Sequence, residues 1–262
     1  MSAEAEPRRL LEAVHEAAQL AADTALDRWT RSRGSHDTKD DGSPVTDGDR
    51  ASERAVREWL ERHYPDDGVL GEEFGLTRPN SPRRWTVDPI DGTRSYVLGL
   101  PLWGSLVAVC EGTRVLAGAA VFPALGTSLV AAPGLGCRMD GAPVRVSEIG
   151  AVGQATLLLT DARALVAGPR ADQLARLARE ASMVRTWGDC VGYLLVATGR
   201  AEVMIDTVMQ PWDAAPLQPI IEEAGGVFTD LNGRATAFGD GVIATNRALA
   251  DTARRTMGVH LV

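Results

Sequence analysis

The sequence predicts a layered α/β (α+β) protein in which helices cover β-sheets, and three observations support this fold class. Apolar residues recur at helical spacing in residues 10–29 and 55–60. From residue 85, short apolar segments separated by turn residues have the composition of β-strands. From about residue 147, strand and helix patterns alternate. We therefore expect helices on a largely antiparallel sheet in the first half and an α/β arrangement in the second.

Two amphipathic helices are predicted before the first long strand. The apolar positions of the first are spaced as on one helix face: Leu10, Leu11, Val14, Ala18, Ala21, Ala22, Ala25 and Trp29. The second helix occupies residues 46–64, after a polar loop at residues 32–44. Its start, TDGD, fits a capping box in which Thr46 and Asp49 satisfy each other's backbone N–H groups.

The predicted strands of the first half include residues 85–88, 102–110, 114–122 and 127–132, with hairpin turns at 111–114 and 139–143. In the second half, strands are predicted at 155–161, 201–206, 227–230 and 242–245, and helices at 170–181, 190–199, 212–226 and the C-terminus. We expect an N-terminal α+β half at residues 1–140 and a C-terminal α/β half at 141–262. No long linker separates them.

Proline complicates one of these helices. Pro216 lies near its predicted first turn, where the ring is tolerated. Pro219 removes a hydrogen bond unless it also falls in the opening turns.

Composition narrows the class of protein. The 262 residues carry a net charge of −8, which argues against nucleic acid or an anionic membrane as the main partner. A phosphorylated small molecule remains a possible partner of this acidic chain, because bound cations reverse the local negative field.

The cysteines and the N-terminus indicate the compartment. Three cysteines without a CxxC pair indicate reduced thiols. The N-terminus lacks a signal-peptide pattern, and the apolar runs are too short to span a bilayer, so a cytoplasmic protein is expected.

Acidic residues form four clusters, and each has a structural alternative. Asp49 fits a helix cap, Glu72-Glu73 a solvated turn, and Asp213 a helix N-cap. Asp88 and Asp91, in the stretch DPIDGT, lie at the end of an apolar strand where two negative charges should repel each other.

Divalent cations would relieve this repulsion. Mg²⁺ prefers carboxylate and carbonyl oxygens, and two ions about 3.5–4 Å apart clamp the attacking and leaving oxygens of a phosphoryl transfer. Asp88 and Asp91 are suited to flank such a pair, with the carbonyl of Ile90 between them. Gly92 and Thr93 then begin a turn whose N–H groups are suited to hold a phosphate.

The ordered motifs GEEFG, WTVDPIDGT and PWDAAPLQPIIEEAGG resemble the inositol monophosphatase superfamily, and the similarity extends over essentially the whole chain. The resemblance implies a five-layer αβαβα sandwich, a Mg²⁺-dependent phosphomonoesterase with two or three ions per active site, and a homodimer. It implies these metal ligands: Glu72, Asp88 (bridging two ions), the carbonyl of Ile90, Asp91 and Asp213.

The same resemblance assigns the remaining roles. Glu72 and Thr93 would orient the attacking water, with Asp49 as a partner of Thr93. Gly92 and Thr93 would hold the phosphate, while Lys39 and Glu73 would support the metal site. The family forms no covalent phospho-enzyme, and all four histidines of this chain lie outside the motifs.

The turn Gly188-Asp189-Cys190 bears on the substrate. Inositol-type enzymes usually have small residues there, whereas GDC resembles the histidinol-phosphate phosphatases of the superfamily, as does the stretch around Lys39. Asp189 or Asp206 would favour the cationic histidinol phosphate over a neutral polyol. Asp189 also fits a helix N-cap, and Cys190 fits a small buried residue better than a nucleophile.

We therefore expect an enzyme that hydrolyses L-histidinol phosphate to L-histidinol and phosphate in histidine biosynthesis. An inositol-1-monophosphatase or a broad small-molecule phosphatase is the alternative within this class. A non-catalytic metal-binding or interaction protein that keeps the fold is the alternative from another class.

Overall fold

The structure is a computed structural model that describes residues 5–31, 36–39, 42 and 44–260. Parts of the predicted polar loop, at 32–35, 40–41 and 43, lie outside the described residues. The described residues on either side of these gaps form a small two-stranded sheet of β1 (Asp37–Thr38) and β2 (Pro44–Val45).

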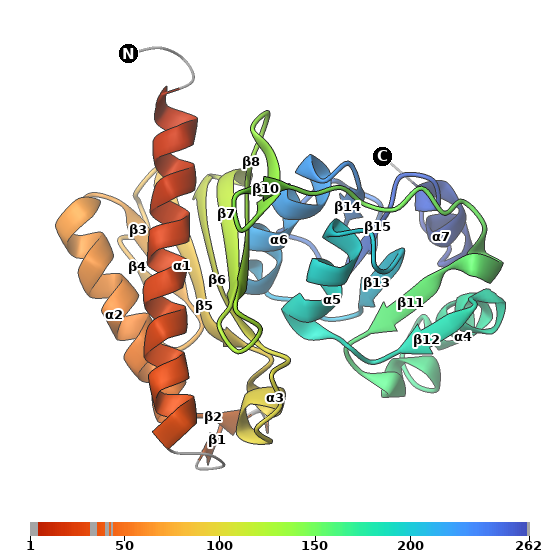
Figure 1. The fold of residues 1–262 in the computed structure, drawn as a ribbon, viewed down its shortest axis with the longest axis horizontal. Helices are drawn as coiled ribbons and strands as arrows, with labels where there is room; N and C mark the ends of the chain where they lie inside the picture. The colour runs from red at the N-terminus through yellow and green to blue at the C-terminus, as the bar shows by residue number, and fades with distance from the viewer. Residues whose placement is uncertain (1–4, 32–35, 40–41, 43, 261–262) are drawn as a thin grey trace.

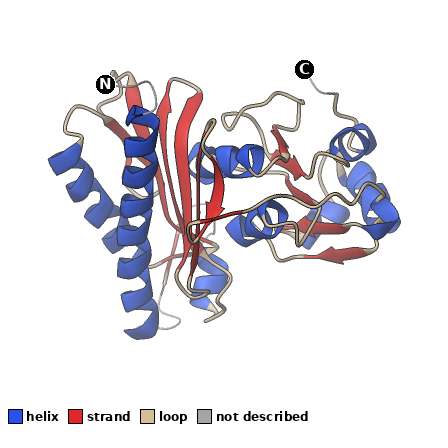
Figure 2. Ribbon diagram, turned by 45° about the horizontal axis from the view of Figure 1, so that its top comes forward, coloured by secondary structure: helices blue, strands red, loops and turns tan. Residues whose placement is uncertain are grey.

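Helices and sheets alternate in five layers (Figures 1 and 2). The helices of the described chain are α1 (Ala5–Arg31), α2 (Asp47–His63), α3 (Thr93–Val97), α4 (Ala171–Glu180), α5 (Asp189–Ala197), α6 (Pro211–Glu223) and α7 (Ala250–Thr256), with 3₁₀ turns η1 (Val152–Gln154) and η2 (Ala162–Leu165). α1 and α2 cover the outer face of a large sheet, α5 and α6 lie between the two sheets, and α4 and α7 cover the outer face of the second sheet. The predicted αβαβα sandwich is confirmed.

The large sheet has eight strands. In spatial order they are β10 (Ala142–Pro143), β9 (Gly136–Met139), β8 (Thr127–Ala132), β7 (Arg114–Phe122), β6 (Gly104–Glu111), β5 (Arg83–Asp91), β3 (Gly68–Gly71) and β4 (Gly75–Thr77). Only β3 and β5 pair in parallel among them, so the predicted antiparallel character is confirmed. Both predicted hairpin turns are present, between β6 and β7 and between β9 and β10.

The second sheet has five strands, in the order β12 (Met183–Arg185), β11 (Thr156–Leu159), β13 (Val203–Asp206), β15 (Val242–Thr245) and β14 (Val227–Thr229). β11 pairs in parallel with β12 and β13, and the other pairs are antiparallel. The short β12 was not predicted.

Alternating residues of the strands send their side chains to opposite cores. In β6, Val107 and Val109 face α1 and α2, while Leu106 and Ala108 face α5 and α6. In β13, Met204 faces the middle core and Ile205 faces α4 and α7. The middle core thus joins both sheets. The division of the chain near residue 140 stays a prediction, because α6 from the second half packs on the first sheet.

One proline of α6, Pro216, departs from the expected position near the first turn, whereas the position of Pro219 was left open. The helix begins at Pro211, so Pro216 and Pro219 both lie inside it and not in its first turn. Gly118 of β7 allows α6 to lie close to the sheet, since a Cβ there would be 2.3 Å from the carbonyl oxygen of Pro216. Packing against the sheet keeps the helix continuous although two backbone N–H groups are missing.

Candidate active site

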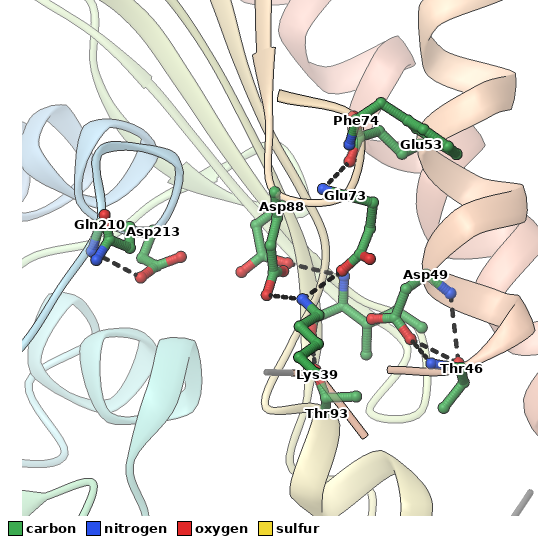
Figure 3. A network of polar contacts seen from close by, with 12 residues as sticks. Lys39, Thr46, Asp49, Glu53, Glu73, Phe74, Asp88, Thr93, Gln210 and Asp213 are labelled. Carbon is green, nitrogen blue, oxygen red and sulfur yellow. Dashed lines mark hydrogen bonds and ion pairs between the residues drawn. The ribbon is translucent and has the colours of Figure 1, made fainter. Parts of the chain in front are cut away.

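Three carboxylates converge at the end of β5. Asp88, Asp91 and Asp213 each offer an oxygen, and these oxygens all lie within 4.8 Å of one another. The pairing of β5 with β6 shifts register between Asp88 and Asp91, so both side chains turn toward the same site. Asp213 reaches it from the first turn of α6, where its carboxylate also accepts a 3.0 Å hydrogen bond from the N–H of Gln210 (Figure 3). The expected N-cap position of Asp213 is therefore wrong: Gln210 is the N-cap, and Asp213 is the third helical residue, whose carboxylate closes a capping box with Gln210 while it faces the site.

Local hydrogen bonds hold the DPIDGT segment in place. The Ile90 N–H donates to a carboxylate oxygen of Asp88 at 2.9 Å, and the Thr93 hydroxyl donates to the Ile90 carbonyl at 2.9 Å. Gly92 has φ 89° and caps the short helix α3, which the sequence analysis treated as a turn. A Cβ on Gly92 would lie 2.7 Å from the carbonyl oxygen of Leu102, so glycine is required here on two grounds.

Burial and mutual repulsion disfavour the ionised forms of these carboxyl groups. Burial, together with the charges of Glu72 and Asp91, raises the pKa of Asp88 well above its usual range. Burial and the charge of Asp213 raise the pKa of Asp91 to about 8, and burial raises the pKa of Asp213 to about 7. Three carboxylates that repel one another and offer only oxygen ligands are suited to a hard divalent cation, because the cation binds their deprotonated forms and offsets the repulsion.

Lys39, Glu72 and Glu73 form a second group beside these carboxylates. The Lys39 Nζ lies 2.7 Å from Oε1 of Glu72 and 2.6 Å from Oε1 of Glu73. Burial by itself lowers the pKa of Lys39. The hydrogen bonds to Glu72 and Glu73 outweigh this effect, so the pKa of Lys39 is raised above its usual range. The structure thus brings the lysine and both glutamates together as the sequence analysis expected, and Glu72 also lines the cleft with Asp88.

Asp49 is confirmed as part of a capping box. Its carboxylate accepts hydrogen bonds from the backbone N–H and the hydroxyl of Thr46, at 2.7 and 2.6 Å, while Thr46 caps the start of α2. Burial raises the pKa of Asp49 to about 7. The hydroxyl of Thr93 pairs with Ile90 instead, so the expected partnership of Asp49 and Thr93 stays a prediction.

The turn before α5 closes the site from the second half of the chain. The expected N-cap role of Asp189 is wrong: Gly188 is the N-cap, and Asp189 is the first helical residue, with a left-handed φ of 50°. The N–H of Asp189 donates to the Thr160 hydroxyl at 2.9 Å, and the N–H of Cys190 donates to a carboxylate oxygen of Asp91. Burial and the charge of Asp91 raise the pKa of Asp189 to about 8.

Cys190 and Asp206 lie beneath the site. The Cys190 side chain is fully buried, and burial raises the pKa of its thiol well above the usual range, as expected for a packing residue. Asp206 is also buried and accepts a 2.9 Å hydrogen bond from the Tyr193 hydroxyl. Burial raises its pKa to about 6. Asp206 is absent from the cleft lining, so the structure does not place this predicted substrate residue on the cleft surface.

The carboxylates open into a cleft of about 840 Å³ between the two halves of the chain. Besides the predicted residues, its lining includes Arg94, Asp161, Arg163, Gln210 and Trp212. None of the five was expected from the sequence: Trp212 lies within the motif PWDAA and Arg94 directly follows DPIDGT, but neither motif indicated a role for them, and Asp161, Arg163 and Gln210 lie outside every motif.

Two further residues near the site were missed. Thr160 follows β11 and holds Asp189, and the buried Glu53 of α2 binds the turn at Glu73. Glu53 had one signal in the sequence: a charged residue on the same face of the helix as Val56 and Leu60.

Comparison with known proteins agrees with this geometry. The model of the inositol monophosphatase family matches residues 6–259. The chain belongs to the inositol monophosphatase family. This is a family of metal-dependent phosphomonoesterases, so the carboxylate cluster is the site where a metal is expected.

Among curated members, the chain is 42% identical over 236 residues to a histidinol-phosphatase of Chlorobaculum parvum, covering 89% of this chain and 91% of that protein. It is 40% identical over 220 residues to a histidinol-phosphatase of Mycobacterium tuberculosis, covering 82% and 85%. Among solved structures, an inositol monophosphatase of Zymomonas mobilis superposes with a TM-score of 0.83 at 28% identity, covering 99% of this chain and 100% of that one.

In the described part of this family member, no helix combines the length and apolar character needed to cross a membrane.

Proposed function

We propose that this protein is a Mg²⁺-dependent phosphatase that hydrolyses L-histidinol phosphate to L-histidinol and phosphate, a reaction of histidine biosynthesis. The convergence of Asp88, Asp91 and Asp213 in a cleft carries the phosphatase assignment. The substrate assignment is supported by the curated relatives, which are named histidinol-phosphatases and match most of the chain at 40–42% identity.

The metal ligands in this proposal are Glu72, Asp88, the carbonyl of Ile90, Asp91 and Asp213, and they would hold two or three Mg²⁺ ions, with Asp88 shared between two. When bound, Mg²⁺ neutralises the phosphate and lowers the pKa of water. The chain provides the ligands in a geometry that is already built, because main-chain N–H groups fix Asp88, Asp91 and Asp213.

The remaining residues orient the reactants. Glu72 would orient the attacking water and is itself held by Lys39, which also binds Glu73. Thr93 orients the same water, with Asp49 behind it, and the Gly92–Thr93 turn holds the phosphate.

Substrate selection would depend on the acidic end of the cleft. Asp189 lines the cleft from the start of α5, in the second half of the chain, whereas Lys39 and Glu72 line it from the first half. Burial and the charge of Asp91 raise the pKa of Asp189 to about 8, and the ammonium and imidazolium groups of histidinol phosphate would favour its ionised form, which a neutral polyol would not. Asp206 would act indirectly, through the hydroxyl of Tyr193 beneath this end of the cleft.

A substrate panel with and without Mg²⁺ tests both parts of the proposal. We expect Mg²⁺-dependent release of phosphate from histidinol phosphate, with a kcat/KM at least about tenfold above that for inositol 1-phosphate. Equal or reversed preference would support the inositol-phosphatase alternative, and no hydrolysis of any phosphomonoester would support a non-catalytic role.

We further propose a cytoplasmic homodimer. All three cysteines are buried free thiols, as is usual for a reducing compartment. Sedimentation velocity of the full chain measures the oligomeric state, and a single monomeric species at micromolar concentration would contradict the dimer.

A further inference from the structure

Glu53 is a fully buried carboxylate of α2 that makes three hydrogen bonds. Its Oε2 accepts from the N–H of Glu73 at 2.7 Å. Its Oε1 accepts from the N–H of Phe74 at 3.2 Å and from Nε of Arg57 at 2.7 Å. Figure 3 shows the Glu53 side chain reaching from the helix to the turn that carries Glu73 and Phe74. A buried charge is tolerated only when it is paired and hydrogen-bonded in this way.

These bonds fix the turn that presents Glu72 to the cleft. The N–H of Glu72 donates to the carbonyl of Val87 at 3.2 Å, one residue before Asp88 on β5. The next two N–H groups of the turn donate to Glu53. The backbone of Glu72 is thus tied to β5 on one side and to α2 on the other, which orients its carboxylate toward Lys39 and the cleft.

The Glu53 carboxylate packs tightly against the backbone of Gly71. A Cβ built on Gly71 would lie 1.9 Å from Oε1 of Glu53 and 2.3 Å from its carboxyl carbon. The carboxylate therefore occupies the space beside Gly71, the last residue of β3 and the residue before Glu72 in the chain.

We propose that Glu53 is a positioning residue of the metal site: its carboxylate binds the turn after β3 so that the Glu72 carboxylate is held at the distance from Asp88 that Mg²⁺ binding needs. Glu53 touches neither substrate nor metal. The inference rests on the proposed function, because it assigns Glu72 as a metal ligand. Removal of Glu53 would loosen Glu72 and weaken Mg²⁺ binding, while the residues that hold the organic part of the substrate stay in place.

Two variants test this role. Glu53→Gln keeps the shape of the side chain but replaces one accepting oxygen with an N–H₂ donor, which faces the N–H donors that now bind Glu53. Gly71→Ala leaves Glu53 chemically intact and displaces its carboxylate by steric contact. The matched control is Asp67→Asn, because Asp67 is another buried carboxylate of the same half that accepts hydrogen bonds from Trp85 and Arg83, away from the cleft.

The primary measurement is calorimetric Mg²⁺ binding to EDTA-treated full-length protein, with thermal unfolding and steady-state kinetics in parallel. For Glu53→Gln and Gly71→Ala we expect a Kd for Mg²⁺ raised about tenfold or more, in the range of losses from supporting residues of metal sites. Added Mg²⁺ should restore much of kcat, with the KM for histidinol phosphate at saturating Mg²⁺ unchanged. Asp67→Asn should lose stability and keep the wild-type Kd.

Wild-type Mg²⁺ affinity in both variants would overturn the inference, whatever their loss of stability. If Glu53→Gln does not fold, the Gly71→Ala protein decides. A wild-type protein that binds Mg²⁺ but releases no phosphate would contradict the proposed function, and the Mg²⁺ affinities of the variants would then still decide the role of Glu53.

Discussion

The backbone N–H of Cys190 donates a hydrogen bond to the carboxylate of Asp91, a residue 99 positions earlier in the chain. The Cys190 sulfur lies 3.7 Å from the carbonyl oxygen of Asp91 as well. The start of α5 therefore holds one of the three converging carboxylates, and the left-handed backbone of Asp189 directs the Cys190 N–H toward it. Because the donor to Asp91 is a main-chain N–H, we expect the side chain at position 190 to contribute to packing and not to this hydrogen bond.

Cys190→Ala should keep kcat/KM within about threefold of wild type, because the N–H to Asp91 is retained, at a stability loss of about 1 kcal/mol for the buried sulfur. Cys190→Leu should reduce activity strongly, since the Cys190 sulfur already lies close to Gly104 of β6. Phosphate release and urea unfolding check both. Loss of activity in a folded Cys190→Ala protein would mean that the thiol itself takes part.

Asp213→Asn should lower kcat by about a thousandfold or more, because it removes a ligand charge from the metal site. The metal-free variant should unfold at the same temperature as wild type or higher, since one of three mutually repelling carboxylates is gone. Asp91→Asn should behave alike. Thermal unfolding with EDTA or Mg²⁺ measures this, and Mg²⁺-dependent activity surviving in both variants would disprove the metal assignment.

The stability of the metal-free protein should fall as pH rises. Folding raises the pKa of Asp91 to about 8 and that of Asp213 to about 7, from an ordinary value of 3.8. Between these values the folded state binds more protons than the unfolded state, so the free energy of unfolding decreases from about pH 4 to about pH 8. Mg²⁺ binds the deprotonated carboxylates, and its stabilising effect should grow over the same range.

Thermal unfolding in EDTA at about pH 6 and pH 8.5, repeated with Mg²⁺, tests this pH dependence. Asp213→Asn should show a shallower decline in EDTA because it lacks one of the titrating groups. A metal-free wild type that is equally stable at both pH values would show that these carboxyl groups are not protonated in the folded state.

Asp189→Asn should change selectivity more than catalysis. The substitution removes the negative charge at the start of α5 and keeps a residue type that tolerates the left-handed φ. We expect kcat/KM for histidinol phosphate to fall about tenfold relative to that for inositol 1-phosphate. An unchanged ratio, measured side by side with both substrates, would locate substrate selection elsewhere in the cleft.

Gly118→Ala should destabilise the protein by about 1–3 kcal/mol, because the new methyl group would overlap the backbone of Pro216 and push α6 from the sheet. Because α6 carries Asp213, kcat should fall too. Gly153→Ala is the matched control, with its nearest neighbour atom 3.8 Å away. Urea unfolding compares them, and equal stability of the two variants would refute this account of the packing.

Local chemistry explains which features were predictable. The capping box of Thr46 and Asp49 joins residues three apart, and strand and helix periods are visible within a few residues. The predicted N-cap at Asp189 failed because its N–H is held by Thr160, 29 residues away. Pro216, expected near the first turn, lies deeper in α6, and the close packing of its backbone on Gly118 is a long-range contact that helix propensity does not indicate.

The sequence by itself determined the helices other than the short α3, most strands, the acidic motifs and the family to which the chain belongs, since these depend on short-range patterns and on motif order. The family resemblance already grouped Asp88, Asp91 and Asp213, but only the tertiary structure decided how close these carboxylates lie, that burial raises their pKa values, that Glu53 binds the turn at Glu73, and that the Cys190 N–H binds Asp91. The physical reason is distance along the chain: burial and electrostatic coupling arise between residues such as Asp88 and Asp213, which only folding brings together.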